Sequence, residues 1–251
     1  MVIAIASQKG GVGKTSTSIS IAAGLAREFD KKILLIDMDP QANSSKVLLD
    51  NYMDLDKEDT VCATILDRKP LPVFPSKIPN LDIVPSHILL SETDIVLATA
   101  RDHKEERLKT ELDKIKDSYF AIFLDCPPSL GWLTLNSFRA SDNVIVVVAP
   151  GYFELDSISQ IQKSLVEVRG YYNHPIELLG YLYTMKDTTI NSQTSLKIMR
   201  ETYPDKVFDA IVPRNTDLRD AHFERKDIFA YKPTAPSAGA YRKLIKEVFK
   251  L

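Results

Sequence analysis

Residues 8–16, QKGGVGKTS, constrain the fold of this 251-residue chain more than any other segment. They follow the apolar run Val2–Ala6 and precede apolar residues at helical spacing over Thr15–Glu28. A buried strand, a glycine turn and a helix start in this order are typical of a phosphate-binding P-loop, because glycines let backbone N–H groups surround phosphate and the helix dipole attracts it. An ordinary glycine turn is the alternative, but such a turn needs neither the two lysines nor the threonine.

The loop is a variant of the common form G-x-x-x-x-G-K-[ST], with Gln8 in place of the first glycine and a second lysine at Lys9. Lys14 can reach the β- and γ-phosphates, and the Thr15 hydroxyl can ligate Mg²⁺. The sequence therefore predicts a site for a nucleoside triphosphate with Mg²⁺. The residues expected to bind the nucleotide here are Lys9, Gly10, Gly11, Val12, Gly13, Lys14, Thr15 and Ser16.

Strand-like apolar runs alternate with amphipathic helical patterns along the chain. This alternation is typical of an α/β fold with a mainly parallel sheet and helices on both faces, in which ligands bind beyond the carboxyl ends of the strands. We expect a single domain over residues 1–251, with the proline-rich stretch 70–79 as a surface connection. The runs cover 2–6, 33–36, 81–84, 119–124, 143–149, 177–184 and 207–212; the helical patterns cover 15–28, 105–116, 133–140, 157–169, 192–203 and 238–249.

The composition is that of an ordinary globular protein, with 44% hydrophobic and 26% charged residues. A net charge of −2 gives no overall basic field for nucleic acid or acidic lipid. Cys62 and Cys126 lie far apart without metal-type spacing, which suits small buried side chains in a reducing compartment. With no export signal and no apolar stretch near the ~20 residues that span a bilayer, we expect a cytoplasmic protein without membrane insertion.

Two carboxylates follow the apolar run that ends at Ile36. Alternate strand residues point the same way, so Asp37 and Asp39 could share one site. One could hold Mg²⁺ through its waters while the other orients the water that attacks the γ-phosphate. The alternative is that both carboxylates cap the turn before Pro40.

A third carboxylate, Asp125, follows four apolar residues. This is the Walker B arrangement, which places Asp125 near Mg²⁺, although the pattern is also that of a generic strand end. Pro127 and Pro128 restrict the loop that follows, and a stiff loop beside a γ-phosphate is suited to sensing the nucleotide state.

Five ordered segments together resemble the ParA/MinD family of deviant-Walker ATPases, and most closely its ParA/Soj branch, which acts in chromosome or plasmid partition. The resemblance covers almost the whole chain. The segments are QKGGVGKT at 8–15, DMDPQAN at 37–43, DCPPSLG at 125–131 with LT at 133–134, PRN at 213–215 and SAGAY at 237–241.

The resemblance implies an ATPase that uses ATP and Mg²⁺, hydrolyses ATP slowly and is stimulated by a ParB-type partner. ATP would drive formation of a homodimer, and the dimer would bind DNA without sequence preference. Lys9 matches the signature lysine that reaches the phosphates of the other subunit, and Asp39 matches the carboxylate associated with activating water. The implied catalytic residues are Lys9, Lys14 and Asp39, the metal-side residues are Thr15, Asp37 and Asp125, and the adenine-lining residues are Met185, Pro213, Arg214 and Asn215.

Several positions depart from the family pattern. Thr189 and Asp217 stand where Soj-like proteins carry DNA-contacting arginines, and a carboxylate facing phosphate repels it. The segments 149–156 and 221–226 (AHFERK in place of A-P-S-x-G-K) are also altered. From Thr184 onward, thirteen Lys and Arg against nine Asp and Glu leave an excess of four positive charges, which is either a replacement DNA surface or an ordinary solvated one. The candidates are Lys186, Lys197, Arg200, Arg219, Arg225, Lys226, Arg242, Lys243 and Lys246.

Three other functions fit the sequence less well. A MinD-like regulator that positions itself on membrane or protein without binding DNA needs an amphipathic tail separate from the fold. The ending Tyr241–Leu251 is amphipathic but has no flexible linker before it, so packing against the sheet is favoured. An iron–sulfur carrier needs paired cysteines, and C-x-x-C is absent. The intact lysines and carboxylates argue against a catalytically silent adaptor.

Overall fold

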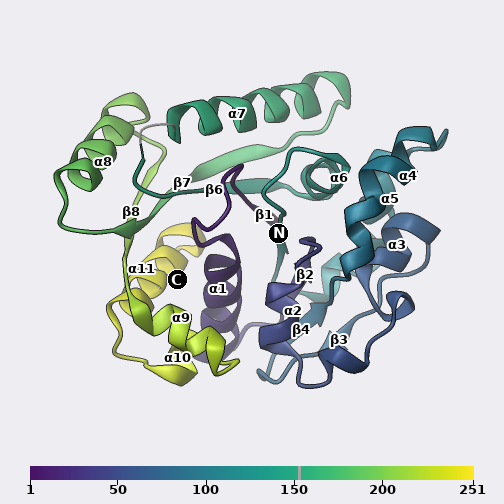
Figure 1. Ribbon diagram of the computed structural model, residues 1–251, viewed down its shortest axis with the longest axis horizontal. Helices are drawn as coiled ribbons and strands as arrows, with labels where there is room; N and C mark the ends of the chain where they lie inside the picture. The colour runs from purple at the N-terminus through teal and green to yellow at the C-terminus, as the bar shows by residue number, and fades with distance from the viewer. Residues whose placement is uncertain (152–153) are drawn as a thin grey trace.

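The computed structural model, which describes residues 1–151 and 154–251, contains a mainly parallel eight-stranded sheet (Figure 1). The strand order is β3-β4-β2-β5-β1-β6-β7-β8, and each described pair is parallel except β3 with β4. The expected α/β fold is confirmed. The strands are β1 (Val2–Ala6), β2 (Ile33–Asp37), β3 (Phe74–Pro75), β4 (Leu81–Val84), β5 (Ala121–Asp125), β6 (Asn143–Val148), β7 (Glu177–Lys186) and β8 (Val207–Pro213).

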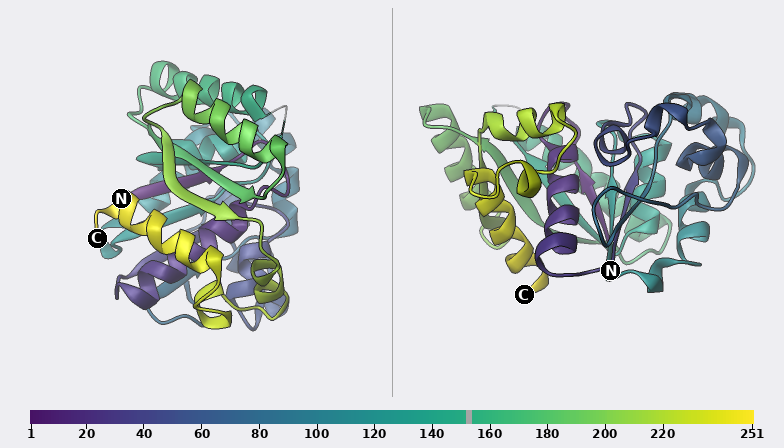
Figure 2. Two further views of the ribbon diagram at one scale, coloured as in Figure 1. Left: turned by 90° about the vertical axis from the view of Figure 1, so that its left-hand side faces the viewer. Right: turned by 90° about the horizontal axis from the view of Figure 1, so that it is seen from below.

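Helices cover both faces of the sheet, with α7 on one side and α1 and α11 on the other (Figures 1 and 2). The longer helices are α1 (Lys14–Glu28), α6 (Trp132–Ala140), α7 (Glu154–Tyr171), α8 (Ile190–Thr202), α9 (Thr216–Phe223) and α11 (Pro236–Phe249). The shorter ones are α2 (Asn43–Leu48), α3 (Val61–Asp67), α4 (Thr93–Thr99), α5 (Arg107–Leu112) and α10 (Ile228–Tyr231). Short 3₁₀ turns are η1 (Tyr52–Asp54), η2 (Lys57–Asp59), η3 (Ile88–Glu92), η4 (Lys104–Glu106) and η5 (Lys116–Ser118).

The central strands are apolar on both sides because each side packs against a helical layer. Ile3 and Ile5 of β1 belong to the core shared with α1 and α11, whereas Val2 and Ala4 belong to the core shared with α6 and α7. All four side chains are buried. Cys62 and Cys126 are free and fully buried, as the sequence predicts.

Helix α11 packs against α1, as expected from its apolar stripe. Tyr241, Leu244 and Ile245 are buried, and the Tyr241 hydroxyl lies 3.2 Å from Thr17 Oγ1. Gly24 of α1 permits the close approach, because a Cβ there would lie 2.5 Å from Cδ1 of Ile245. No helix in the described part of the chain has the length and apolar character needed to cross a membrane.

Most predicted elements are present, and the differences arise where tertiary contacts decide local structure. The predicted helix 105–116 is divided into η4, α5 and η5, because i→i+3 bonds such as Ile115 N–H to Leu112 O tighten the chain after α5. The proline-rich connection 70–79 contains the short edge strand β3, whose Phe74 packs against the core and pairs with Ile83. Helices α2, α3, α4, α9 and α10 were not predicted. The altered family segment 149–156 lies partly outside the described residues.

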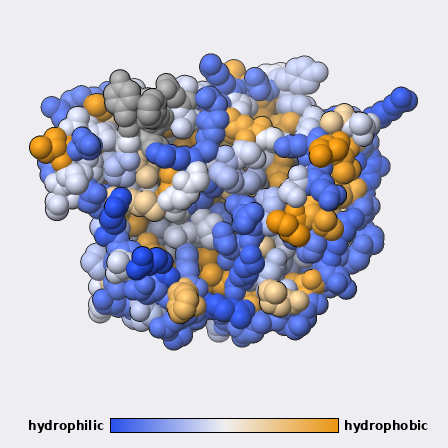
Figure 3. Space-filling model, in the orientation of Figure 1, coloured by the Kyte–Doolittle hydropathy of each residue, from blue (hydrophilic) through white to orange (hydrophobic). Residues whose placement is uncertain are grey.

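Most apolar side chains are inside, but some on η3 and α4 are exposed. Figure 3 shows hydrophilic residues over much of one face, with apolar groups gathered on the right of the view. Ile88 of η3 and Ile95 of α4 are 55% and 76% exposed, and Val96 is 40% exposed.

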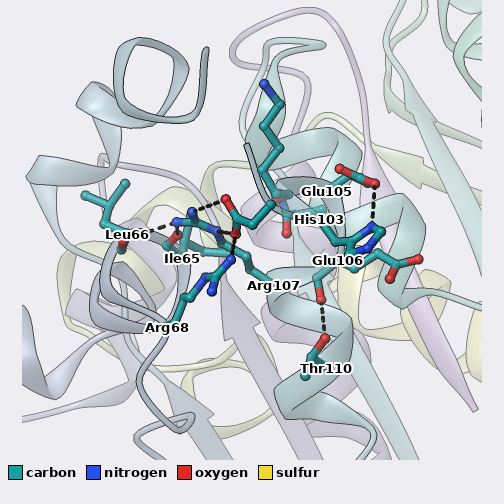
Figure 4. Close-up of polar contacts among 11 residues, drawn as sticks. Ile65, Leu66, Arg68, His103, Glu105, Glu106, Arg107 and Thr110 are labelled. Carbon is teal, nitrogen blue, oxygen red and sulfur yellow. Dashed lines mark hydrogen bonds and ion pairs between the residues drawn. The ribbon is translucent and has the colours of Figure 1, made fainter. Parts of the chain in front are cut away.

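An ion-pair cluster around Asp102 ties α3 to α5. Arg107 Nε and Nη2 lie 3.1 and 3.0 Å from the two oxygens of Asp102, and Arg68 pairs with the same carboxylate. Arg107 Nη1 also donates to the carbonyls of Ile65 (2.6 Å) and Leu66 (3.1 Å) at the end of α3, as Figure 4 shows. The two arginines hold the pKa of Asp102 well below its usual value.

Candidate functional site

The central parallel strands end at one edge of the sheet, and α1 begins at the same edge. Asp37 and Asp125 are paired residues at the ends of β2 and β5, and Asp125 also pairs with Ile5 of β1. The P-loop joins β1 to α1 at this point. Parallel pairing thus brings together three sequence motifs that lie far apart along the chain.

The P-loop has the backbone geometry of a phosphate cradle. Gly11 and Gly13 have φ angles of 75° and 92°, which side chains other than glycine rarely adopt. A Cβ placed on Gly10, Gly11 or Gly13 would meet no atom within 4 Å, so the loop borders open space. No side chain caps the start of α1, which leaves its first N–H groups available to an anion.

The two lysines of the loop occupy different environments. Lys14 is 6% exposed, and its Nζ donates to the carbonyl of Lys9 at 3.1 Å. Burial lowers the pKa of Lys14, while the neighbouring carboxylate of Asp125 opposes that shift. Lys9 is exposed. The buried Lys14 suits the role of binding the phosphates of its own subunit. The exposed Lys9 suits the role, implied by the resemblance, of reaching the phosphates of the other subunit.

Asp37 is fully buried, and its hydrogen bonds come from the start of α2. Oδ2 accepts from Ser45 N–H (2.9 Å) and from the Ser45 hydroxyl (2.7 Å), and Oδ1 accepts from Asp39 N–H (3.2 Å). Burial and, to a lesser extent, the charge of Asp125 together raise the pKa of Asp37 to about 8. The folded chain therefore disfavours the charged form of this carboxyl group unless a cation is nearby.

Asp125 is held by hydroxyl groups from two helices. Oδ1 accepts from Ser18 Oγ at 3.0 Å, and Oδ2 accepts from Ser44 Oγ at 2.7 Å. The nearby Thr15 hydroxyl also favours the charged form of Asp125 and so opposes a rise in its pKa. Burial raises the pKa of Asp125 as well. Within the described residues, neither Asp37 nor Asp125 forms an ion pair with a basic side chain.

This donor set fits a hard cation shared with a nucleotide. Carboxylate and hydroxyl oxygens are the ligands that Mg²⁺ prefers, and Mg²⁺ is usually held by one or two carboxylates together with phosphate oxygens. The part of the chain that the structure describes holds no group of three or more His, Cys, Asp or Glu that could bind a metal alone. A metal held by Thr15, Asp37 and Asp125 would therefore need the phosphates as well.

Asp39 lies just beyond β2 and is partly exposed. Its Oδ1 accepts from Gln41 N–H at 2.9 Å, and its carbonyl accepts from Ala42 N–H at 2.9 Å and from the Ser86 hydroxyl at 2.6 Å. The turn-capping bonds considered for Asp37 and Asp39 are thus present. They hold both carboxylates in place and leave one oxygen of Asp39 without a bond to the turn.

A cavity of about 440 Å³ lies beside the P-loop, between β7, β8 and α9. It brings together Met185, Pro213, Arg214 and Asn215, the residues expected to line adenine, with Gly13 and Ser16 of the loop. The Thr184 hydroxyl donates to the Val12 carbonyl at 2.7 Å and so joins β7 to the P-loop at this cavity. Contact with adenine stays a prediction. Sequence reasoning did not assign Leu218, Arg219, His222 and Tyr241 to this cavity: it considered Arg219 as a DNA contact and Tyr241 as part of a family segment and of the amphipathic ending. The altered segment 221–226 had nevertheless marked this region as unusual.

A second groove of about 610 Å³ runs between α9 and α2, which flank α1 in Figure 1. The groove shares two lining residues with the first cavity, Arg219 and His222. Two apolar side chains stand exposed at it: Met53 at 85% and Phe223 at 91%. Thr15 also lines this groove, so the exposed apolar surface reaches the expected Mg²⁺ position.

Comparison with known proteins agrees with this geometry. A family model described as an AAA domain matches residues 1–178. The chain is 36% identical over 250 residues to the sporulation initiation inhibitor protein Soj of Bacillus subtilis, covering 98% of this chain and 97% of Soj. It is 35% identical over 253 residues to the chromosome partitioning protein ParA of Caulobacter vibrioides, covering 98% and 93% of the two chains.

This chain belongs to the ParA/Soj family of partitioning ATPases. The resemblance inferred from the five sequence segments is therefore confirmed. A solved structure, cobyrinic acid a,c-diamide synthase from Mycobacterium smegmatis with bound ADP and magnesium, matches with a TM-score of 0.81 at 28% identity over 99% of this chain and 94% of that one. The P-loop ATPase fold extends over the described residues of the chain.

Two positions of this ParA/Soj chain differ from the arginines expected there, and each has a local partner. Thr189 caps α8, where its Oγ1 accepts from Ser192 N–H at 3.3 Å. Asp217 lies in the first turn of α9 and pairs with Lys232 Nζ at 3.1 Å. Several of the basic candidates are also engaged in pairs: Lys197 with Glu201, Arg200 with Asp209, Arg219 with Asp220, Lys226 with Glu224 and Arg242 with Glu28.

Proposed function

We propose that this ParA/Soj-family chain is an ATP-driven switch for segregation of a plasmid or chromosome in the cytoplasm. It binds ATP with Mg²⁺, forms a homodimer with the nucleotides between the subunits, binds DNA without sequence preference and hydrolyses ATP slowly until a ParB-type partner stimulates it. The observation that carries the proposal is the buried pair Asp37 and Asp125, which lies beside an uncapped helix start and has no ion pair with a basic side chain in the described chain.

Each side chain of the site has a role that follows from its position. The N–H groups of the loop and the start of α1 bind the phosphates, and Lys14 neutralises part of their charge. Mg²⁺, when bound, would supply further positive charge to the phosphates, and Thr15, Asp37 and Asp125 would hold it. Asp39 orients the attacking water in line with the γ-phosphate, since its free oxygen is not bound to the turn.

Dimerisation is supported by the outer surface of the site. Lys9 is exposed on the loop, where it can contact the phosphates of a second subunit. Met53 and Phe223 expose apolar surface beside the nucleotide cavity, and burial of such a side chain stabilises a contact by about 1.5–3 kcal/mol. Hydrolysis then removes the γ-phosphate that both subunits contact, and the dimer relaxes.

DNA binding is supported by the excess of positive charge after Thr184, which dimerisation would double. It is opposed by the local pairs of the basic side chains. A specific observation therefore keeps a second candidate: with Asp217 paired and Thr189 serving as a cap, the dimer would act on a membrane or protein target without DNA, as MinD-like proteins do.

The test is binding of Asp39→Ala protein to duplex DNA of mixed sequence, with ATP or ADP, at several salt concentrations. This variant should bind ATP, hydrolyse it at least about 100-fold more slowly and accumulate as a dimer, because the attacking water is no longer oriented. Salt-sensitive DNA binding with ATP alone supports the partition switch. Absence of DNA binding by a confirmed ATP dimer moves the function to the second candidate, and a wild-type hydrolysis rate refutes the role of Asp39.

A further inference from the structure

Ser86, which follows strand β4, is hydrogen-bonded to residues of the site. Strand β4 lies next to β2 in the sheet, and Ser86 follows β4 by two residues. Ser86 is fully buried, and its hydroxyl donates to the Asp39 carbonyl at 2.6 Å. The N–H of Ser86 donates to Ser45 Oγ at 2.9 Å. No sequence motif of the site includes this residue.

The two bonds of Ser86 connect it to both carboxylates that follow β2. Because Ser45 Oγ accepts from Ser86 N–H, its single hydrogen is directed to another acceptor, and it donates to Asp37 Oδ2 at 2.7 Å. Ser86 therefore orients Ser45 toward Asp37 and also holds the main chain of Asp39. Tyr52 adds a weaker bond to the Ser86 carbonyl at 3.4 Å.

Asp39 depends on this support because it lies outside the strand. Its neighbours Pro40 and Gln41 are partly or fully exposed, and the carboxylate has only the Gln41 N–H as a partner within the turn. The position of the carboxylate is then set by the Asp39 main chain, whose carbonyl oxygen accepts from both the Ser86 hydroxyl and the Ala42 N–H.

We propose that Ser86 is a positioning residue for ATP hydrolysis, which acts by fixing the Asp39 main chain so that the Asp39 carboxylate meets the attacking water. The inference rests on the proposed hydrolytic function. Ser86 lies outside the residues that line the nucleotide cavity, so its role is in turnover and not in binding of the nucleotide.

Ser86→Ala tests the proposal, with Ser141→Ala as the matched control. Ser141 is also fully buried, and its hydroxyl donates to a main-chain carbonyl, that of Ser137, at 2.7 Å. It precedes β6, however, so it lies at the amino-terminal ends of the parallel strands, opposite the P-loop. Phosphate release, affinity for a fluorescent ATP analogue and thermal unfolding are measured for both variants. A displaced carboxylate lowers turnover by about tenfold or more, so Ser86→Ala should lose this much kcat with an ATP affinity within twofold of wild type. Ser141→Ala should keep the wild-type kcat.

A readout independent of hydrolysis is amide hydrogen exchange over residues 38–43. The N–H groups of Gln41 and Ala42 bond to Asp39, so exchange there should accelerate in Ser86→Ala and remain unchanged in Ser141→Ala. Ser86→Thr, which keeps the hydroxyl, should restore both the slow exchange and most of the kcat. Equal kcat losses in Ser86→Ala and Ser141→Ala, or unchanged exchange in Ser86→Ala, would overturn the positioning role. Absence of turnover in the wild type would instead refute the proposed function, and the exchange result would still stand by itself.

Discussion

Two regions of the molecule place aspartate side chains in opposite electrostatic environments. These are the strand-end site, with Asp37 and Asp125, and the ion-pair cluster around Asp102. Asp37 and Asp125 are fully buried, are bonded by hydroxyl and N–H groups, and have raised pKa values. Asp102 is paired with Arg107 and Arg68 and has a lowered pKa. The cluster around Asp102 contains its own positive charge, two guanidinium groups for one carboxylate, and serves the α3–α5 contact. Within the described residues the strand-end pair forms no ion pair with a basic side chain, and the nearby Lys14 is itself buried with a lowered pKa, so a bound cation such as Mg²⁺ would balance the charge of the two carboxylates.

The largest expected effect comes from removing the buried cation of the strand-end site. Lys14→Ala should weaken ATP binding by at least about 100-fold, because the phosphates lose a charge-assisted contact inside a buried site. Fluorescence titration with an ATP analogue measures the loss. Lys114→Ala, which removes an exposed lysine paired with Glu111, is the control and should bind ATP normally. Normal ATP affinity in Lys14→Ala would mean that the loop is not the phosphate site.

A smaller effect is expected from Asp37→Asn in the absence of nucleotide. Burial raises the pKa of Asp37 from 3.8 to about 8, so the folded chain retains a proton that the unfolded chain loses. The wild type should therefore lose stability as the pH rises from about 4 toward 8. Asp37→Asn removes this loss and should raise the free energy of unfolding at pH 8 by about 1–3 kcal/mol, while Mg²⁺ no longer strengthens ATP binding.

Urea unfolding at pH 6 and pH 8 measures the first effect, and ATP titration with and without Mg²⁺ measures the second. Asp37→Glu keeps the charge and should retain a decrease in stability with rising pH. The comparison between the two regions fails if the free energy of unfolding depends on pH in the same way in Asp37→Asn and in the wild type.

The smallest effect, on stability alone, is expected from a substitution in the ion-pair cluster around Asp102. Asp102→Ala should destabilise the fold by about 1 kcal/mol at pH 7, since partly exposed ion pairs contribute little, and should leave ATP hydrolysis unchanged. Because the pKa of Asp102 is lowered in the folded state, the difference from wild type should shrink as the pH falls below about 4, where the unfolded chain binds a proton.

Urea unfolding over this pH range checks the prediction for Asp102. Asp205→Ala, at an exposed aspartate, is the control and should change stability by less than about 0.5 kcal/mol. A loss of hydrolysis in Asp102→Ala would show that the two regions are coupled, contrary to the comparison.

The sequence predicted those parts of the molecule whose signals are local. The run Val2–Ala6 followed by glycines and lysines specifies β1, the P-loop and α1 within thirty residues, and the structure places them as expected. Helix α2 has no such pattern, because it is six residues long and is held by Ser44 and Ser45 through their bonds to Asp125 and Asp37.

Ser86 lay beyond sequence reasoning for a related reason. It reaches Asp39 only because β4 is the neighbour of β2, although β3 and the stretch 70–79 come between them in the chain. In the same way, Arg219 and His222 line the cavity beside the P-loop through the packing of α9, and the altered segment 221–226 showed only that this region differs. Pairings between distant segments decide such contacts, whereas local patterns decide single elements.

The packing of α11 on α1 has a consequence for synthesis on the ribosome. Thr17 beside the P-loop touches Tyr241, 224 residues later, and Gly24 receives Ile245. At about 5–20 residues per second, a nascent chain carries an exposed P-loop helix for roughly 10 to 45 seconds before its covering helix is made. The cavity beside the P-loop, which Tyr241 lines, is complete only then. A chain released early by the ribosome therefore has the phosphate loop but lacks one wall of this cavity.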